Sequence, residues 1–420
     1  MKVCVIGNGG REHALAWRLS ISPSVTKVYA IPGSAAMSDC AELVGIDWQR
    51  SDHLIHFLKN NHVDLVVVGP EAPLVAGLAD VLNKAGIPVF GPSKAAAQLE
   101  GSKVFAKDLM KKYNIPTAAY GVFHKVDEAK EFIAQTGAPI VVKADGLAAG
   151  KGVVVAMTVE EANAAVEDML SGNRFGEAGS TVVIEEFMEG EEASLLAFVD
   201  GKTVVPMIAS QDHKRIFDGD KGPNTGGMGT YAPAPVLTDT LRDEAMKTIL
   251  EPMVAAMQKE NMPYVGCLYA GLMITPQGPK VVEFNARFGD PETQVVLPLL
   301  DSDLGQIMMA CATGNLTADM VKWKDSSAAC VILASKGYPE TSSKGDVIHG
   351  DIKQHDTTIV FHSGTKLVGE EYVTNGGRVL GVVGLGKDLR TALDRAYGRI
   401  EHINFEGMQY RTDIGAKAFK

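Results

Sequence analysis

The sequence predicts a multidomain protein of mixed α/β and α+β class, and three observations support this prediction. At about 150 residues per domain, the 420 residues correspond to roughly three domains. Strand and helix patterns alternate through the N-terminal quarter, which is typical of a doubly wound parallel sheet. Farther along, strand patterns are joined by turn signals such as Asp200-Gly201 and Gln277-Gly278, which favour antiparallel pairing.

The first predicted domain covers residues 1–102. Short apolar runs predict its strands, and the segments between them predict its helices. The expected strands are Val3–Ile6, Val25–Ala30, Leu65–Val68 and Val89–Phe90, and the expected helices are Arg11–Leu19, Ser51–Asn60 and Gly77–Ala85. Because strands that alternate with helices are joined by right-handed crossovers, the sheet should be parallel.

A different pattern begins after residue 102, with a small α+β unit at about 120–190 and antiparallel strands beyond it. The expected helices are Lys103–Tyr113, Val159–Leu170 and Leu389–Ile400. The expected strands are Ile140–Lys143, Gly152–Ala156, Thr181–Glu185, Glu192–Val199, Val204–Ser210, Ala270–Ile274, Lys280–Phe284, Ala328–Leu333, Ile359–Ser363 and Val379–Leu385. A Gly- and Pro-rich stretch, Asp218–Pro235, interrupts these strands.

Composition and charge exclude several classes of protein. Apolar residues make up 46% of the chain and charged residues 22%, which is typical of a globular protein and not of a disordered chain. The longest apolar runs are far shorter than the ~20 residues that span a bilayer, so no membrane partner is expected. The net charge of −11 argues against nucleic acid as a partner. A local group of cations can still bind an anionic small molecule.

Cysteine usage favours a reducing compartment. The five cysteines are scattered and form no CxxC pair, which predicts neither a zinc site nor a disulfide framework. A strand pattern begins at Lys2, so no signal peptide is expected. Together these features predict a cytoplasmic protein.

A glycine-rich segment, Gly7–His13, joins the first predicted strand to the first helix. Glycines let the backbone approach an anion, and the helix N-terminus adds free N–H groups. Glu12 replaces the third glycine of a dinucleotide fingerprint, and the second strand ends without an acidic residue, which disfavours NAD. A phosphorylated small molecule is the preferred ligand, and a tight turn without a ligand is the alternative.

Lys143 ends an apolar strand, and the Gly-rich loop Asp145–Gly152 follows it. Such a lysine can contact nucleotide phosphates, and such a loop can close over them as a lid. The loop is not a P-loop, because Lys151 is followed by Gly152 and not by Ser or Thr. A plain hairpin connection is the alternative.

The strand that ends near Glu185 runs into a linker with Glu186, Phe187, Glu191 and Glu192. Backbone groups of such a linker can bind an adenine edge, and a following carboxylate can accept hydrogen bonds from ribose hydroxyls. A strand edge with solvated acids is the alternative.

The most informative polar cluster follows the strand Lys280–Phe284. Glu283, Asn285 and Arg287 alternate, so an extended segment places them on one face. Carboxylate and amide oxygens suit a hard cation such as Mg²⁺. The guanidinium can brace a transferring phosphoryl group. A surface strand with a salt bridge is the alternative.

A further polar cluster, Gln211–Arg215, precedes the glycine-rich segment Asn224–Gly229. An aspartate can bind an ammonium group, and an arginine or backbone N–H groups can bind a carboxylate. This combination suits a small zwitterion, with a solvated loop as the alternative.

The order and spacing of these motifs resemble the ATP-grasp ligases and, along almost the whole chain, the glycinamide ribonucleotide synthetase family. The most specific motif is Arg287-Phe288-Gly289-Asp290-Pro291-Glu292-Thr293-Gln294. The supporting motifs are Gly7–His13, Gly69–Leu74, Lys143–Gly152, Gln211–Arg215 and Gly226–Gly229. The resemblance implies four units: an N-terminal domain (1–102), a central ATP-grasp domain (103–119 and 191–326), a lid domain (120–190) and a C-terminal domain (327–420).

The activity implied by the resemblance is an ATP-dependent ligation in purine biosynthesis. Glycine would be joined to 5-phosphoribosylamine through glycyl phosphate, with release of ADP and phosphate. We expect a cytoplasmic monomer that binds small molecules.

The resemblance also implies roles for individual residues. Arg287 and Lys143 would be catalytic. ATP would be bound by Lys103, Lys143, Glu185, Glu186, Phe187, Glu191 and Glu192. The other substrates would be bound by Gly9, Gly10, Arg11, Glu12, His13, Glu71, Asp212, Lys214, Gly227, Arg287 and Pro291. Mg²⁺ or Mn²⁺ would be bound by Glu283 and Asn285.

One position departs from the wider superfamily. Many ATP-grasp enzymes have a second metal carboxylate on the preceding strand, where this chain has Gly271. Water or phosphate oxygens would then complete the metal shell. Two other hypotheses are a ligase that acts on a different carboxylate such as bicarbonate, and a nucleotide-binding regulatory protein without chemistry.

Overall fold

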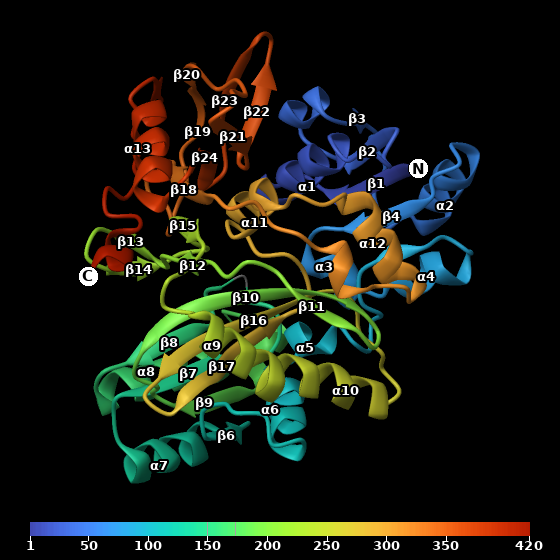
Figure 1. Cartoon of the computed structure of the whole chain (residues 1–420). Helices are drawn as coiled ribbons and strands as arrows, with labels where there is room; N and C mark the ends of the chain where they lie inside the picture. The colour runs from blue at the N-terminus through green and yellow to red at the C-terminus, as the bar shows by residue number, and fades with distance from the viewer. Residues whose placement is uncertain (149, 173) are drawn as a thin grey trace.

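A parallel five-stranded sheet forms the N-terminal part of the computed structural model, which describes residues 1–148, 150–172 and 174–420 (Figure 1). The strand order is β3-β2-β1-β4-β5, which confirms the predicted doubly wound domain. The strands are β1 (Lys2–Gly7), β2 (Lys27–Pro32), β3 (Glu42–Leu43), β4 (Leu65–Val68) and β5 (Val89–Phe90). The helices are α1 (Gly10–Ser20), α2 (Ser51–Asn60), α3 (Glu71–Val75) and α4 (Leu78–Lys84).

Neighbouring strands β1 and β4 end at the same edge of this sheet, so the loops that follow them lie together. Glu12 fills the space between these loops. A Cβ atom would stand 2.4 Å from Cγ of Glu12 if placed on Gly7, and 2.5 Å from it if placed on Gly69. The glutamate therefore fits only because both positions are glycine. Arg11 and Glu71 are thereby placed at one edge of the domain.

An antiparallel sheet in the order β11-β10-β16-β17 forms the central unit. Its strands are β10 (Glu191–Asp200), β11 (Val204–Pro206), β16 (Val265–Thr275) and β17 (Gly278–Asn285). Its helices are α5 (Gln98–Gly101), α6 (Lys103–Lys112) and α9 (Asp239–Ala245), which continues through a π-helical turn into α10 (Glu251–Lys259).

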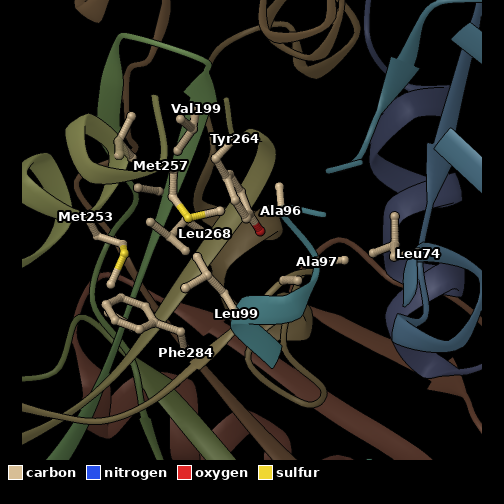
Figure 2. Close-up of a cluster of buried hydrophobic side chains, with 14 of the residues drawn as sticks. Leu74, Ala96, Ala97, Leu99, Val199, Met253, Met257, Tyr264, Leu268 and Phe284 are labelled. Carbon is tan, nitrogen blue, oxygen red and sulfur yellow. The ribbon is translucent and has the colours of Figure 1, made fainter. Parts of the chain in front are cut away.

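Methionines of α10 pack against this central sheet. Figure 2 shows Met253 and Met257 near Leu268 of β16 and Phe284 of β17, with Leu99 of α5 beside them. All five side chains are at most 3% exposed. Because side chains alternate along a strand, the burial of Phe284 directs its neighbours in β17 to the opposite face of the sheet.

The segment predicted as the lid contains a smaller antiparallel sheet in the order β6-β9-β7-β8. Its strands are β6 (Tyr120–Phe123), β7 (Ile140–Ala144), β8 (Val153–Ala156) and β9 (Val182–Glu186), and its helices are α7 (Val126–Thr136) and α8 (Val159–Ser171). The predicted Gly-rich loop joins β7 to β8. Within that loop, Ala149 lies outside the described residues.

The C-terminal sheet has the order β12-β15-β18-β24-β21 and packs against α13 (Leu389–Ile400). Its strands are β12 (Gln211–Asp212), β15 (Gly229–Ala232), β18 (Ser327–Ala334), β21 (Thr358–His362) and β24 (Arg378–Gly386). Two of these strands, β12 and β15, come from before residue 327, so the chain crosses to this sheet between β11 and β12 and leaves it after β15. The predicted bounds of the central and C-terminal domains stay a prediction.

The remaining elements are short hairpins, ribbons and helices. They are β13 (Arg215–Phe217) with β14 (Lys221–Asn224), β19 (Lys344–Val347) with β23 (Glu371–Asn375) and β22 (Thr365–Val368), β20 (His349–Gly350) with β25 (Ile403–Asn404), α11 (Thr293–Val296) and α12 (Leu304–Thr313). No helix in the described ranges is long and apolar enough to cross a membrane.

Some predicted elements differ from the observed ones. The strand predicted at Val204–Ser210 is wrong beyond Pro206, where the N–H of Met207 still donates to the carbonyl of Leu196 and an isolated bridge joins Ser194 to Ser210. Helix α12 was not predicted, because its sequence is apolar on nearly every side and lacks amphipathic periodicity.

His13 of α1 lies where the N-terminal and C-terminal units meet. Its side chain is 3% exposed, and its Nδ1 accepts a hydrogen bond from the N–H of His362 at 3.0 Å. Its ring packs edge-on against Phe361. Burial, with a smaller contribution from His362, lowers the pKa of His13 to about 3, so His13 is neutral at pH 7.

We expect His13 to destabilise the fold as the pH falls below about 6.5, its unfolded pKa. The unfolded chain then binds a proton that the folded chain does not bind, until the folded pKa of about 3 is reached. At pH 5 the cost is about 2 kcal/mol relative to pH 7. His13→Asn keeps an acceptor and should show a smaller fall in thermal midpoint between pH 7 and pH 5 than the wild type. An equal fall in both proteins would contradict this expectation.

Candidate active site

A cavity of about 700 Å³ lies among the four units. It brings together many of the predicted site residues: Arg11, Glu71, Lys103, Lys143, Glu185, Glu186, Phe187, Glu191, Glu192, Asp212, Lys214, Glu283, Asn285 and Arg287. The other predicted residues are not part of its wall: Gly9, Gly10, Glu12, His13, Gly227 and Pro291.

Glu185 of β9 is a buried carboxylate between two lysines. Its Oε2 lies 3.1 Å from Nζ of Lys143, and its Oε1 lies 3.3 Å from Nζ of Lys107. The Lys107 contact lacks hydrogen-bond geometry, so Oε1 has no hydrogen-bond partner among the described residues. A buried acceptor of this kind fits an amino group such as that of adenine.

One face of α6 lines this end of the cavity. Lys103, Ala106, Lys107 and Met110 follow each other at helical spacing and all belong to the wall. Burial lowers the pKa of Lys107 to about 8, although Glu185 opposes this shift. The periodicity of α6 was the sequence signal that could have identified Lys107.

Lys103 also holds the Gly-rich loop. Its Nζ donates to the carbonyls of Ala144 and Gly146 at 2.9 and 3.0 Å. The backbone N–H of Lys103 donates to Oδ1 of Asp145 at 2.6 Å, which caps α6. Helix and loop are therefore fixed to each other beside the cavity.

The linker between β9 and β10 follows Glu186, whose Oε2 accepts a hydrogen bond from the N–H of Ala119 at 3.1 Å. No described residue pairs with the backbone groups of Phe187 and Met188, which line the cavity. Glu191 and Glu192 then begin β10 with exposed side chains. These features are compatible with a nucleotide base and its sugar, and the binding roles of these residues stay a prediction.

Glu283 and Asn285 occupy the cavity face of β17. In the described part of the chain, neither side chain has a hydrogen bond or an ion pair. The cavity walls remove part of the hydration of Glu283 and would raise its pKa, but the charges of Lys143, Lys214 and Lys103 outweigh this and lower it. Two unpaired oxygen-bearing side chains fit a hard divalent cation.

The strand geometry limits this metal site to few protein ligands. Gly271 of β16 pairs directly with Glu283, so the neighbouring strand offers no side-chain ligand at this position. No group of three or more His, Cys, Asp or Glu side chains suited to a metal is present among the described residues. Water or phosphate oxygens would have to complete the shell.

Lys143 reaches across from the lid to the central sheet. A bulge at Val282 interrupts the pairing of β16 with β17. The freed carbonyl of Val282 accepts a hydrogen bond from Nζ of Lys143 at 3.2 Å. This contact places the lysine charge next to Glu283.

Arg287 lies between two carboxylates from earlier parts of the chain. Its Nη2 is 2.8 Å from Oε1 of Glu100, and its Nε is 3.3 Å from Oε2 of Glu71. Burial would lower the pKa of Arg287, but Glu100 and Glu71 outweigh it and raise the pKa. The guanidinium is therefore a fixed positive charge. Glu100 was not predicted, because it belongs to a short helix without a recognisable motif.

An acidic group with one lysine forms another part of the wall. Nζ of Lys214 lies 2.6 Å from Oδ2 of Asp212 and 3.9 Å from Oε1 of Glu292. Glu292 is 1% exposed and accepts a hydrogen bond from the hydroxyl of Tyr269 at 2.7 Å. Two carboxylates facing one lysine leave negative charge available for an ammonium group.

The predicted anion-binding loop is occupied by the chain's own carboxylates. The N–H of Gly9 donates to Oε2 of Glu12 at 3.1 Å, and the N–H of Arg11 donates to Oδ2 of Asp290 at 3.2 Å. A Cβ atom on Gly10 would stand 2.3 Å from Oγ of Ser363, so the C-terminal unit covers this glycine. Of this loop, Arg11 alone contributes to the cavity wall.

Gly227 and Pro291 support the wall from behind. Gly227 has a φ of +125°, and a Cβ atom there would stand 2.6 Å from Cδ of Pro291 and 2.8 Å from Oδ2 of Asp212. The absence of a side chain at Gly227 therefore lets the two loops approach each other.

Family models match three segments of the chain. Residues 1–100, 101–293 and 328–417 match the N domain, the ATP-grasp (A) domain and the C domain of phosphoribosylglycinamide synthetase. Relatives named phosphoribosylamine–glycine ligase include those of Halalkalibacterium halodurans and Escherichia coli O157:H7, which are 53% and 51% identical. Both alignments cover 100% of this chain, and they cover 97% and 99% of the relatives.

Solved structures agree with these matches. A phosphoribosylamine–glycine ligase from Thermotoga maritima is 33% identical, with a TM-score of 0.86, over 99% of this chain and 100% of that chain. The biotin carboxylase domain of a Hydrogenobacter thermophilus 2-oxoglutarate carboxylase, in complex with MgADP and bicarbonate, is 17% identical with a TM-score of 0.74. This second match covers 97% of this chain and 91% of that chain and shows a shared fold. With all three domain models matched in order along its length, the chain belongs to the phosphoribosylglycinamide synthetase family.

Proposed function

We propose that this chain catalyses the ATP-dependent joining of glycine to 5-phosphoribosylamine, which yields glycinamide ribonucleotide, ADP and phosphate. The observation that supports this most is one cavity with two differently charged regions. In one region, lysines suit the phosphates of a nucleotide, and Glu283 and Asn285, whose side chains have no partner among the described residues, suit a divalent cation. Asp212, Glu292 and Arg287 in the same cavity suit an amino acid.

The first step is attack of the glycine carboxylate on the γ-phosphorus of ATP. An oxygen–phosphorus bond forms to glycine, the bond to ADP breaks, and glycyl phosphate results. Lys143 and Arg287 are fixed charges that stabilise the negative charge of the transferring group. A Mg²⁺ or Mn²⁺ ion at Glu283 and Asn285 would supply Lewis-acid charge stabilisation.

The second step is attack of the amine of phosphoribosylamine on the acyl carbon. The carbon–nitrogen bond forms and phosphate leaves. Asp212 would hold the glycine ammonium group, and Arg287 would stabilise the oxyanion. The Gly-rich loop held by Lys103 would exclude water, which otherwise hydrolyses an acyl phosphate.

Several finer assignments belong to this proposal. Glu185 and the Phe187 backbone would bind adenine, and Glu191 or Glu192 would bind ribose. Contacts of substrate with Gly9, Gly10, Glu12, His13, Gly227 and Pro291 stay predictions. The choice of Mg²⁺ or Mn²⁺, a monomeric state and a cytoplasmic location are also proposed, the last supported by five cysteines that form no disulfide.

The test is release of ADP by the purified chain with Mg²⁺. We expect release when glycine and phosphoribosylamine are both present, and little release when either is omitted. Phosphoribosylamine can be formed in the assay from ribose 5-phosphate and ammonia. Release with bicarbonate in place of glycine would favour a different carboxylate as substrate. Tight binding of ATP without release would favour a regulatory protein.

A further inference from the structure

Four arginines line the cavity, and they fall into two kinds. Arg11 and Arg287 each use all three guanidinium nitrogens in contacts with carboxylates or carbonyls. Arg215 and Arg378 each use Nη1 alone. In the described part of the chain, Nε and Nη2 of these two residues have no partner.

Arg378 is firmly anchored through its one engaged nitrogen. From β24, its Nη1 donates to the carbonyls of Gly226 and Asp290 at 3.0 and 2.9 Å. A Cβ atom on Gly226 would stand 2.8 Å from Cζ of Arg378, so the guanidinium lies flat against the glycine backbone. Its side chain is 22% exposed. The free Nε–Nη2 edge can bind a phosphate or carboxylate with two parallel hydrogen bonds.

Arg215 is brought near this position by the β13–β14 hairpin. Its Nη1 donates to the carbonyl of Gly222 at 2.8 Å, and Arg215 pairs with Asn224, two residues before Gly226. No described carboxylate lies within 4 Å of its guanidinium. The second arginine thus also offers free donors beside the glycine-rich segment.

The C-terminal tail adds a third cation and fixes the hairpin. It lies beside β13 and β14 (Figure 1). Asp220 holds this tail through two ion pairs: its carboxylate oxygens lie 2.9 Å from Nη1 of buried Arg411 and 2.9 Å from Nζ of Lys417. Lys417 also belongs to the cavity wall. The N–H of Thr412 donates to Oδ1 of Asp218 at 2.8 Å. Arg215, Arg378 and Lys417 thus bring three cations to this end of the cavity, where Arg378 already contacts Asp290 and Lys417 already contacts Asp220.

We propose that Arg215 and Arg378, with Lys417 beside them, bind the 5-phosphate of phosphoribosylamine. This inference rests on the proposed function and names the part of the cavity that recognises the phosphorylated sugar. It differs from the glycine-loop site predicted from sequence, whose Gly9 and Arg11 N–H groups are already paired with Glu12 and Asp290. The C-terminal unit would therefore determine the selectivity for a phosphorylated amine.

The experiment compares two amines that differ in the phosphate alone. Phosphoribosylamine is formed from ribose 5-phosphate and ammonia, and ribosylamine from ribose and ammonia. The ratio of their kcat/KM values measures recognition of the phosphate, and it does not depend on the fraction of enzyme that is folded. In Arg378→Gln and Arg215→Gln we expect this ratio to fall at least about 10-fold, with a larger fall in the double variant. KM for ATP and for glycine should stay within about twofold of the wild type.

Arg395→Gln is the matched control. Arg395 is an exposed arginine of the same unit, outside the cavity wall, with one hydrogen bond to the carbonyl of Leu385 at 2.7 Å. Its variant should keep the wild-type ratio. An unchanged ratio in both cavity variants would overturn the inference, as would a raised KM for glycine or ATP with an unchanged ratio. If the wild type releases no ADP with phosphoribosylamine and glycine, the proposed function itself fails.

Discussion

Arg287→Ala is expected to lower turnover at least about 100-fold while ATP binding persists. Arg287 provides a fixed positive charge in the cavity, and its ion pairs with Glu71 and Glu100 hold the guanidinium in one position. In the proposed site, ATP would be held mainly by residues of α6, β7 and β9, which the substitution does not touch. Turnover is measured by ADP release, and ATP affinity by calorimetry. Near-normal turnover would exclude the catalytic role.

A second variant separates catalysis from stability. Removing Arg287 leaves Glu71 with Arg11 alone, at 4.0 Å, and leaves Glu100, which has 8% of its side chain exposed, without its ion-pair partner. Burial already raises the pKa of Glu100, so an uncompensated charge there is costly. Adding Glu100→Gln to Arg287→Ala should restore part of the thermal stability. Turnover should remain low in this double variant, whereas recovery of turnover would indicate a purely structural role.

Glu283→Gln is expected to raise the Mg²⁺ concentration needed for half-maximal activity and to lower turnover at saturating metal at least about 100-fold. The side chain keeps its shape but loses its charge, and Gly271, which pairs with position 283 on the neighbouring strand, offers no side-chain ligand in its place. Binding of Mn²⁺ can be followed by its paramagnetic effect on water relaxation, which does not depend on activity.

Asn285→Asp and Glu260→Gln serve as controls for this metal site. Asn285→Asp keeps an oxygen ligand and adds charge, so metal binding should persist. Glu260 pairs with Lys112 outside the cavity wall, and its variant should behave as the wild type. Equal Mn²⁺ affinity in the wild type and Glu283→Gln would show that the metal binds elsewhere.

Sequence patterns predicted those parts of the candidate site whose residues lie close together in the chain, on one strand or in one loop. The alternation of Glu283 and Asn285 along one strand holds in the structure because the core side chain Phe284 between them fixes the register. Lys143 at the end of β7 and the loop after it were likewise visible as a strand followed by glycines. The family could be predicted because its motifs are short local sequences that follow one another in a fixed order along the chain.

Contacts between residues that are far apart in the chain could not be predicted from the sequence. The pairing of Arg287 with Glu71 and Glu100 joins residues about 200 positions apart, and no spacing rule relates them. The Gly7–His13 segment has the composition of an anion site. Asp290, which accepts from the N–H of Arg11, lies 279 residues away, so the sequence could not show that this site is already filled.

By itself, then, the sequence determined the fold class, the family and the strand that offers Glu283 and Asn285, because these depend on periodicity and motif order. The tertiary structure alone decided which charges are already neutralised and which remain free for substrates. Among the described residues, Nε and Nη2 of Arg215 and Arg378 have no partner, whereas every guanidinium nitrogen of Arg11 already contacts a protein oxygen. The physical reason is that a charge is paired through space, by whichever distant groups the packing of the four units brings within hydrogen-bond distance.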